Sequence, residues 1–101
     1  MQLERALEIR PNVPEVINNL GSVFVQQKKQ AKAVQLFEQA IVLRPNYARA
    51  RFNLAGALEE VNVRRAIEEY ETYLVLVEGI SEEEQRVSLA EVRLKQLKGE
   101  K

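Results

Sequence analysis

The sequence repeats itself with a period of 34 residues. The tripeptide Arg10-Pro11-Asn12 recurs at that spacing as Arg44-Pro45-Asn46. Four further identities lie at the same spacing: Glu4 and Glu38, Ala6 and Ala40, Asn19 and Asn53, and Leu20 and Leu54. A period of about 34 residues is typical of stacked helical hairpins, because one hairpin is too small to bury its apolar face without a neighbour. The repeat therefore predicts an all-α fold in which each unit packs against the next.

Apolar residues at helical spacing divide the chain into helical segments. We expect helices over residues 1–10, 14–27, 30–43, 47–60, 64–77 and 81–98. Pro11 and Pro45 end the first and third segments, because proline lacks the backbone N–H and its ring clashes with the preceding turn. After Gly79, Ser81 and Glu84 have the spacing of a capping box, which predicts a helix that begins at the serine.

Composition restricts the chemistry that this chain can perform. Fifteen basic and fifteen acidic side chains cancel, so no net field attracts the chain to nucleic acid or to an anionic membrane. The sequence has no cysteine and no histidine, which removes the thiolate nucleophile and the commonest general base and metal ligand. Its acidic runs are expected to be solvated faces or helix starts, because consecutive helix residues diverge around the axis. We therefore expect no enzyme activity and no cofactor.

No segment of the sequence has the features of a membrane or targeting segment. The apolar runs are interrupted by charges well short of the roughly 20 residues that span a bilayer. The first residues, Met1-Gln-Leu-Glu-Arg, do not resemble a signal peptide. The compartment is left unknown, with the cytoplasm slightly favoured because no signal peptide or transmembrane segment is present in this chain.

Residues 14–47 contain an ordered set of large and small residues. The set consists of Ile17, Leu20, Gly21, Phe24, Ala33, Phe37, Ala40 and Pro45. In this order and spacing it resembles the tetratricopeptide repeat. The resemblance implies a right-handed α-solenoid of antiparallel helix hairpins. It also implies that Gly21, Ala33 and Ala40 lie where helices approach too closely for larger side chains.

The resemblance divides the chain into one solenoid over residues 1–98 and a disordered tail over 99–101. Within the solenoid, residues 1–12 match the second helix of an incomplete repeat, 13–46 a complete repeat, 47–79 a repeat with a one-residue deletion, and 81–98 a C-terminal capping helix. The deletion is visible because Ala33 and Ala66 are 33 residues apart instead of 34. Tyr73 occupies the place that Ala40 has one repeat earlier, and no proline follows it, so the regular array ends there.

The capping helix is expected to present an apolar stripe to the solenoid. The stripe consists of Val87, Ala90, Leu94 and Leu97. Arg86 and Arg93 are expected to face water on the polar side, which is how a solenoid closes its end.

The resemblance also implies a peptide-binding groove lined by the first helix of each pair. The groove positions fall on Asn18, Asn19, Ser22, Val25, Arg49, Phe52, Asn53 and Gly56. Carboxamides such as Asn19 and Asn53 donate and accept hydrogen bonds, so they can hold the backbone of an extended peptide. Phe52 offers an apolar anchor, and Arg49 suits a carboxylate. The alternative is that these asparagines make hydrogen bonds only within the repeats.

The expected function is a non-catalytic protein-protein interaction scaffold that binds a peptide segment of a partner protein in the concave groove. The alternative is a structural self-assembly module that forms homo-oligomers through its N-terminal helix, where Leu3 and Leu7 lack a hairpin partner. A third interpretation is that the chain is a fragment of a longer array, whose other repeats cover that surface.

Overall fold

The computed structural model describes residues 12–99, and every regular element in that range is helical. The elements are α2 (Pro14–Gln26), α3 (Gln30–Leu43), α4 (Ala48–Leu58), α5 (Val63–Leu76), the 3-10 turn η1 (Ser81–Glu83) and α6 (Glu84–Leu97). Apart from the start of α6, the helices begin and end within two residues of their expected bounds. The expected helix over residues 1–10, with Leu3 and Leu7, lies outside the described residues.

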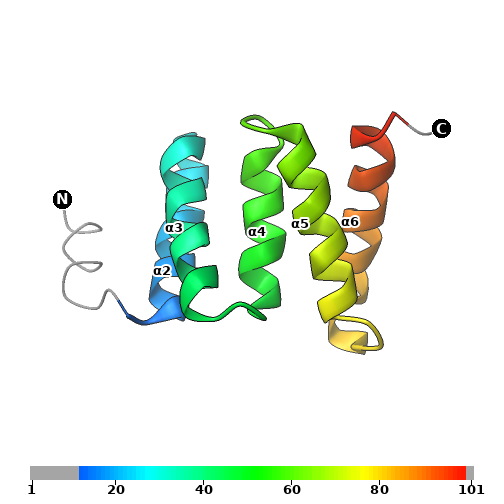
Figure 1. Cartoon of the computed structure of the whole chain (residues 1–101), viewed down its shortest axis with the longest axis horizontal. Helices are drawn as coiled ribbons and strands as arrows, with labels where there is room; N and C mark the ends of the chain where they lie inside the picture. The colour runs from blue at the N-terminus through cyan, green and yellow to red at the C-terminus, as the bar shows by residue number, and fades with distance from the viewer. Residues whose placement is uncertain (1–11, 100–101) are drawn as a thin grey trace.

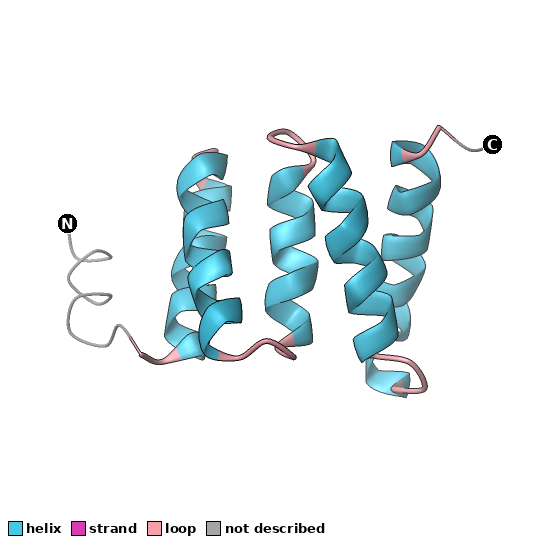
Figure 2. Ribbon diagram, viewed as in Figure 1, coloured by secondary structure: helices cyan, strands magenta, loops and turns pink. Residues whose placement is uncertain are grey.

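Successive helices run antiparallel and pack as an α-solenoid of hairpins (Figures 1 and 2). α3 lies against both α2 and α4, and α5 lies against both α4 and α6, while α2 also touches α4. Each helix between the ends of the array is therefore covered by the helices before and after it in sequence. This arrangement places α2, α4 and α6 in equivalent positions along the stack.

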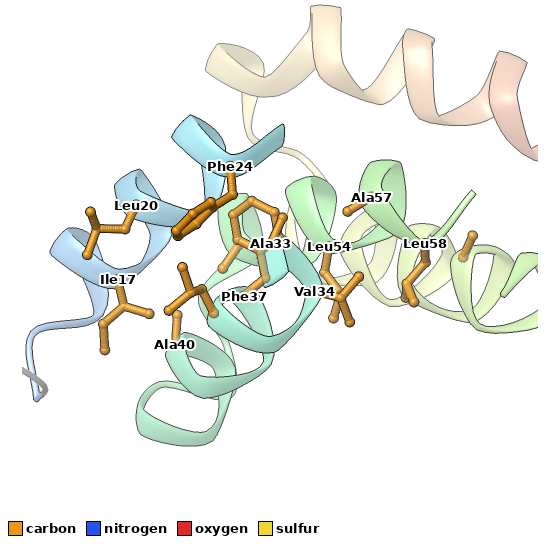
Figure 3. Close-up of a cluster of buried hydrophobic side chains, with 13 residues drawn as sticks. Ile17, Leu20, Phe24, Ala33, Val34, Phe37, Ala40, Leu54, Ala57 and Leu58 are labelled. Carbon is orange, nitrogen blue, oxygen red and sulfur yellow. The ribbon is translucent and has the colours of Figure 1, made fainter. Parts of the chain in front are cut away.

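The first hydrophobic core joins α2, α3 and α4 (Figure 3). Its fully buried members include Ile17, Ala33, Phe37, Ala40 and Leu58. Phe37 lies so close to α2 that a Cβ atom built on Gly21 would be 2.5 Å from Cε1 of the ring. The expectation that a small residue is needed at Gly21 is thereby confirmed, because real Cβ atoms do not approach other carbon atoms so closely.

The second hydrophobic core joins α4 and α5 to α6. It consists of the buried residues Ala55, Tyr70, Tyr73, Val77, Ala90 and Leu94. Phe52 of α4 packs beside this core, with its ring centroid 5.1 Å from that of Tyr73 and 5.9 Å from that of Tyr70. Tyr73 is fully buried, although it occupies the alanine position of the repeat.

The capping box expected at the start of the last helix is wrong. Ser81 lies in η1, and its hydroxyl donates to Glu82 Oε1 at 3.4 Å. No side-chain capping bond is made at the start of η1 or of α6. The reason lies in Glu83, whose carboxylate accepts the hydroxyl of buried Tyr73 and so holds the segment in a 3-10 turn.

We predict opposite effects of alanine at two helical glycines. Gly21→Ala introduces a methyl group into the Phe37 ring and should destabilise the fold by about 1–3 kcal/mol. Gly56→Ala is the matched control, because its Cβ would lie 3.9 Å from Tyr70 Oη, at ordinary contact distance. It should stabilise the helix by about 0.5–1 kcal/mol. Urea unfolding followed by circular dichroism measures both, and equal effects would contradict the close approach of α2 and α3.

Candidate functional site

The expected groove residues lie on α2 and α4, and the structure adds a third wall from η1 and α6. We use the name groove face for the surface formed by Asn19, Ser22, Arg49, Phe52, Asn53, Gly56, Gln85, Arg86 and Leu89. Its members from α2 and α4 were expected from the sequence, whereas its members from α6 were not. All of them are exposed or half-buried.

Asn18 is an internal residue. Its side chain is 3% exposed, and its Oδ1 accepts a hydrogen bond of 3.0 Å from Nδ2 of Asn53. Its carbonyl oxygen accepts another of 3.3 Å from the hydroxyl of Ser22. Asn18 is thus used to join α2 to α4, which leaves it no room to contact a ligand.

The two asparagines at equivalent repeat positions have different surroundings. Asn53 is half-buried by its bond to Asn18, and its own carbonyl oxygen is left as an acceptor. Asn19 is exposed, and no hydrogen bond joins its side chain to another residue in the described range. Val25 is half-buried against the first core. Of the expected positions on α2, Asn19 and Ser22 are those that present polar groups to the surface.

A hollow of ≈ 350 Å³ lies between α4 and the start of α6. It is lined by Phe52, Glu82, Gln85, Arg86 and Leu89. Leu89 is 50% exposed although it is a large apolar residue. The hollow therefore combines an apolar surface with amide, guanidinium and carboxylate groups.

Sequence reasoning missed the α6 residues because it treated that helix only as a cap. The signal was present in the spacing. Moving 33 residues from Phe52, Asn53 and Gly56, as the shortened repeat requires, gives Gln85, Arg86 and Leu89. These three residues are the ones that α6 contributes to the hollow. The register of the repeat thus continues through α6, even though its identities do not.

Glu83 forms a polar cluster at the edge of the hollow. Its Oε1 accepts the hydroxyl of Tyr73 at 2.5 Å and lies 3.6 Å from Nη1 of Arg86. Its Oε2 lies 4.0 Å from Nη2 of Arg49, a side chain that is 54% exposed. Burial, together with the hydrogen bond to Glu83, raises the pKa of Tyr73. Both arginines keep N–H donors for a ligand, and Arg86 is not the simple solvent-facing residue that the sequence predicted.

Glu59 forms a second polar cluster between α4 and α6. Its carboxylate accepts the hydroxyl of Tyr70 at 2.5 Å and Nε of Arg93 at 3.1 Å, and Nη2 of Arg93 donates to its other oxygen. Burial raises the pKa of Glu59, but the hydrogen bonds from Arg93 and Tyr70 outweigh it, so that the net pKa is lowered. Burial and the Glu59 carboxylate raise the pKa of Tyr70. Arg93 is therefore a tie between helices, which corrects the expectation that it faces water.

The described residues contain no group of three or more acidic side chains placed to hold a metal ion. None of the helices between residues 12 and 99 has the length and apolar character needed to cross a membrane.

We predict that Asn53→Ala destabilises the fold whereas Asn19→Ala does not. The first substitution leaves the buried Oδ1 of Asn18 without its donor, which should cost about 1–3 kcal/mol. The second removes an exposed side chain and should change the free energy of unfolding by less than about 0.5 kcal/mol. Thermal and urea unfolding of the two variants compare these costs. Equal stabilities would show that the Asn18–Asn53 bond contributes nothing.

We predict that acid weakens the attachment of α6 through Glu59. A carboxyl group with a lowered folded-state pKa contributes stability above its unfolded pKa, and loses it as the pH falls through the folded pKa. Unfolding free energies measured between about pH 7 and about pH 3 should therefore fall more steeply for the wild type than for Glu59→Gln. Glu68→Gln, at an exposed position of α5, is the control and should follow the wild type. Parallel pH profiles for all three proteins would contradict a role for Glu59.

Comparison with protein families gives a direct match to part of the chain. A family model described as TPR repeat matches residues 21–61. The peroxisomal targeting signal receptor of Eremothecium gossypii is 34% identical over 79 residues, which cover 75% of this chain and 14% of the receptor. The receptor of Kluyveromyces lactis is 38% identical over 50 residues, covering 50% of this chain and 9% of the receptor. The chain therefore spans a small part of these relatives.

Solved structures share the whole fold at low sequence identity. The Yersinia enterocolitica type III secretion chaperone SycD, in complex with a peptide of the translocator YopD, aligns with a TM-score of 0.88 and 13% identity. That alignment covers 95% of this chain and 74% of the chaperone. The first TPR domain of Spaghetti (RPAP3), bound to an HSP90 peptide, aligns with a TM-score of 0.81 and 21% identity, covering 96% of this chain and 72% of that one. The solenoid architecture is thus shared beyond the matched repeat.

Proposed function

Because this chain belongs to the tetratricopeptide repeat proteins, we propose that it is a non-catalytic interaction scaffold that binds an extended segment of a partner protein on the groove face. The observation that carries the proposal is the hollow between α4 and α6, where half-exposed Leu89 lies with Phe52 beside the guanidinium group of Arg86. Apolar anchors beside hydrogen-bonding groups are the usual means by which a surface holds a peptide.

Three features of the groove face suit different parts of such a segment. The hollow accepts an apolar side chain, since Phe52 is held rigidly against Tyr70 and Tyr73. Asn19 and the free acceptor of Asn53 suit backbone N–H and C=O groups of an extended chain. Arg49 and Arg86 suit an acidic group of the ligand, which would compete with Glu83 for their donors.

The comparisons support the same class of function. The curated relatives are named as receptors for a peroxisomal targeting signal. Two of the similar structures are complexes with peptides, one from YopD and one from HSP90. We infer that this chain also takes a peptide segment of a protein partner, with the identity of the segment set by the hollow.

The proposal predicts a loss of peptide affinity in variants that do not alter the fold. Peptides selected from a random display library on the 101-residue chain, and labelled with fluorescein, provide the probe. Leu89→Glu should weaken their binding by about tenfold or more, because it places a charge in the hollow. Asn19→Ala should weaken it by about two- to tenfold through the loss of one hydrogen bond. Fluorescence anisotropy measures the dissociation constants.

Val75→Glu is the matched control, because Val75 is an apolar residue of α5 that is 73% exposed and lies outside the groove face. It should leave the affinity unchanged. Selected peptides that bind Leu89→Glu and Asn19→Ala as tightly as the wild type would place the binding site elsewhere on the molecule.

A further inference from the structure

The side of α6 that faces away from the groove face carries a second, separate cleft of ≈ 560 Å³. The end of α5 and the following turn contribute Leu74, Val77 and Ile80 to it. The first turns of α6 contribute Val87 and Ser88, with exposed glutamates on either side of them along the helix. Among the described residues no helix covers this cleft.

The register of the repeat shows what occupies the same place elsewhere in the molecule. Val87, Ser88 and Glu91 of α6 correspond to Leu54, Ala55 and Leu58 of α4, and to Leu20, Gly21 and Phe24 of α2. In the two earlier repeats these positions are buried, since α3 packs against α2 and α5 against α4. In α6, Val87 is half-buried and the other two are exposed. The cleft is therefore the seat of the second helix of a hairpin.

Residues 1–10 have the sequence of such a second helix. At the repeat spacing, Leu3, Ala6, Leu7 and Arg10 correspond to Phe37, Ala40, Ile41 and Arg44 of α3. Residues 1–10 match α3 without a matching first helix in this chain, and α6 is a first helix without a second. The two halves of one repeat are thus present in the sequence, at opposite ends of the solenoid.

The sizes of the two halves are complementary. In the first repeat the large ring of Phe37 lies over Gly21, where no side chain fits. In the composite repeat the smaller Leu3 would lie over Ser88. The loss of ring volume on one side compensates for the added hydroxymethyl group on the other, which keeps the contact close to native packing density.

The charges of the two halves are complementary as well. In the first repeat Nη1 of Arg44 lies 2.7 Å from Oε2 of Glu15. The residues at the same two repeat positions in the composite pair are Arg10 and Glu82. The acidic residues Glu84 and Glu91 beside the cleft add further attraction for a segment that carries Arg5 and Arg10.

We propose that the α5–α6 cleft binds residues 1–10 of a second copy of this chain, as the helix that completes the third repeat. The contact joins two different surfaces, so each copy that binds presents a free cleft to the next. Association is therefore head to tail and open-ended. It uses none of the α2 or α4 residues of the groove face, so it stands or falls independently of peptide binding.

Sedimentation velocity and light scattering of the 101-residue chain test the proposal. The weight-average mass should rise from the monomer value of 11.6 kDa beyond that of a dimer as the concentration increases. Leu3→Glu removes the apolar anchor of the segment, and Ser88→Arg fills the cleft. Each variant alone should stay monomeric, with the helical circular dichroism spectrum of the wild type.

The decisive sample is an equimolar mixture of the two variants. Leu3→Glu still has a working cleft and Ser88→Arg a working segment, so the mixture should form a dimer and stop there. Arg10→Glu should weaken association by about two- to fivefold, and combining it with Glu82→Arg should restore it. Leu89→Glu, in the groove face, should leave self-association unchanged.

Three results would overturn the proposal. The first is a wild-type chain that stays monomeric at every concentration reached. The second is undiminished association of Leu3→Glu, which would point to contact between two clefts. The third is a monomeric mixture of the two variants, which would show that the cleft accepts some other helix.

Discussion

The close approach of α2 and α3 at Gly21 is the contact on which the rest of the solenoid depends. Phe37 fills the space that any side chain at this position would need, and the two helices bury their apolar faces against each other only at that separation. α4 then packs on the surface that α3 still exposes. Because each hairpin leaves one face for its neighbour, an error in the first spacing would be passed along the stack.

The hydrogen bond between Asn18 and Asn53 shows how the same stacking builds a binding surface. A carboxamide has more donors and acceptors than one partner can satisfy. Asn53 therefore closes the α2–α4 joint with its amide group and still offers its carbonyl oxygen to the surface. Structural and binding roles are combined in one side chain. An interpretation that assigns Asn53 wholly to the ligand or wholly to the fold would miss half of its chemistry.

The sequence was a good guide wherever residues repeat, and a poor one where a helix keeps the register but loses the residues. The 34-residue period, the prolines and the small residues predicted the helices from α2 to α5 and the close contact at Gly21. The roles of Arg86, Leu89 and Arg93 were missed, because α6 has glutamate and serine where the other first helices have apolar and small residues. Periodicity reports spacing in sequence, whereas the Glu59 and Glu83 clusters depend on side chains that meet only after the helices pack.

α6 is held differently from the other helices, and this has consequences for both surfaces that it forms. Its buried side includes the small residue Ala90 and the end residue Leu94, so much of its orientation depends on Arg93 with Glu59, and on Tyr73 with Glu83. These polar ties set the depth of the hollow at Leu89 and, on the opposite side of the helix, the width of the cleft at Val87. A ligand that draws Arg86 or Arg49 away from Glu83 changes the constraint on η1, which also borders the cleft. Through α6, the two surfaces share one mechanical element, so a displacement that favours binding at one alters the free energy of binding at the other.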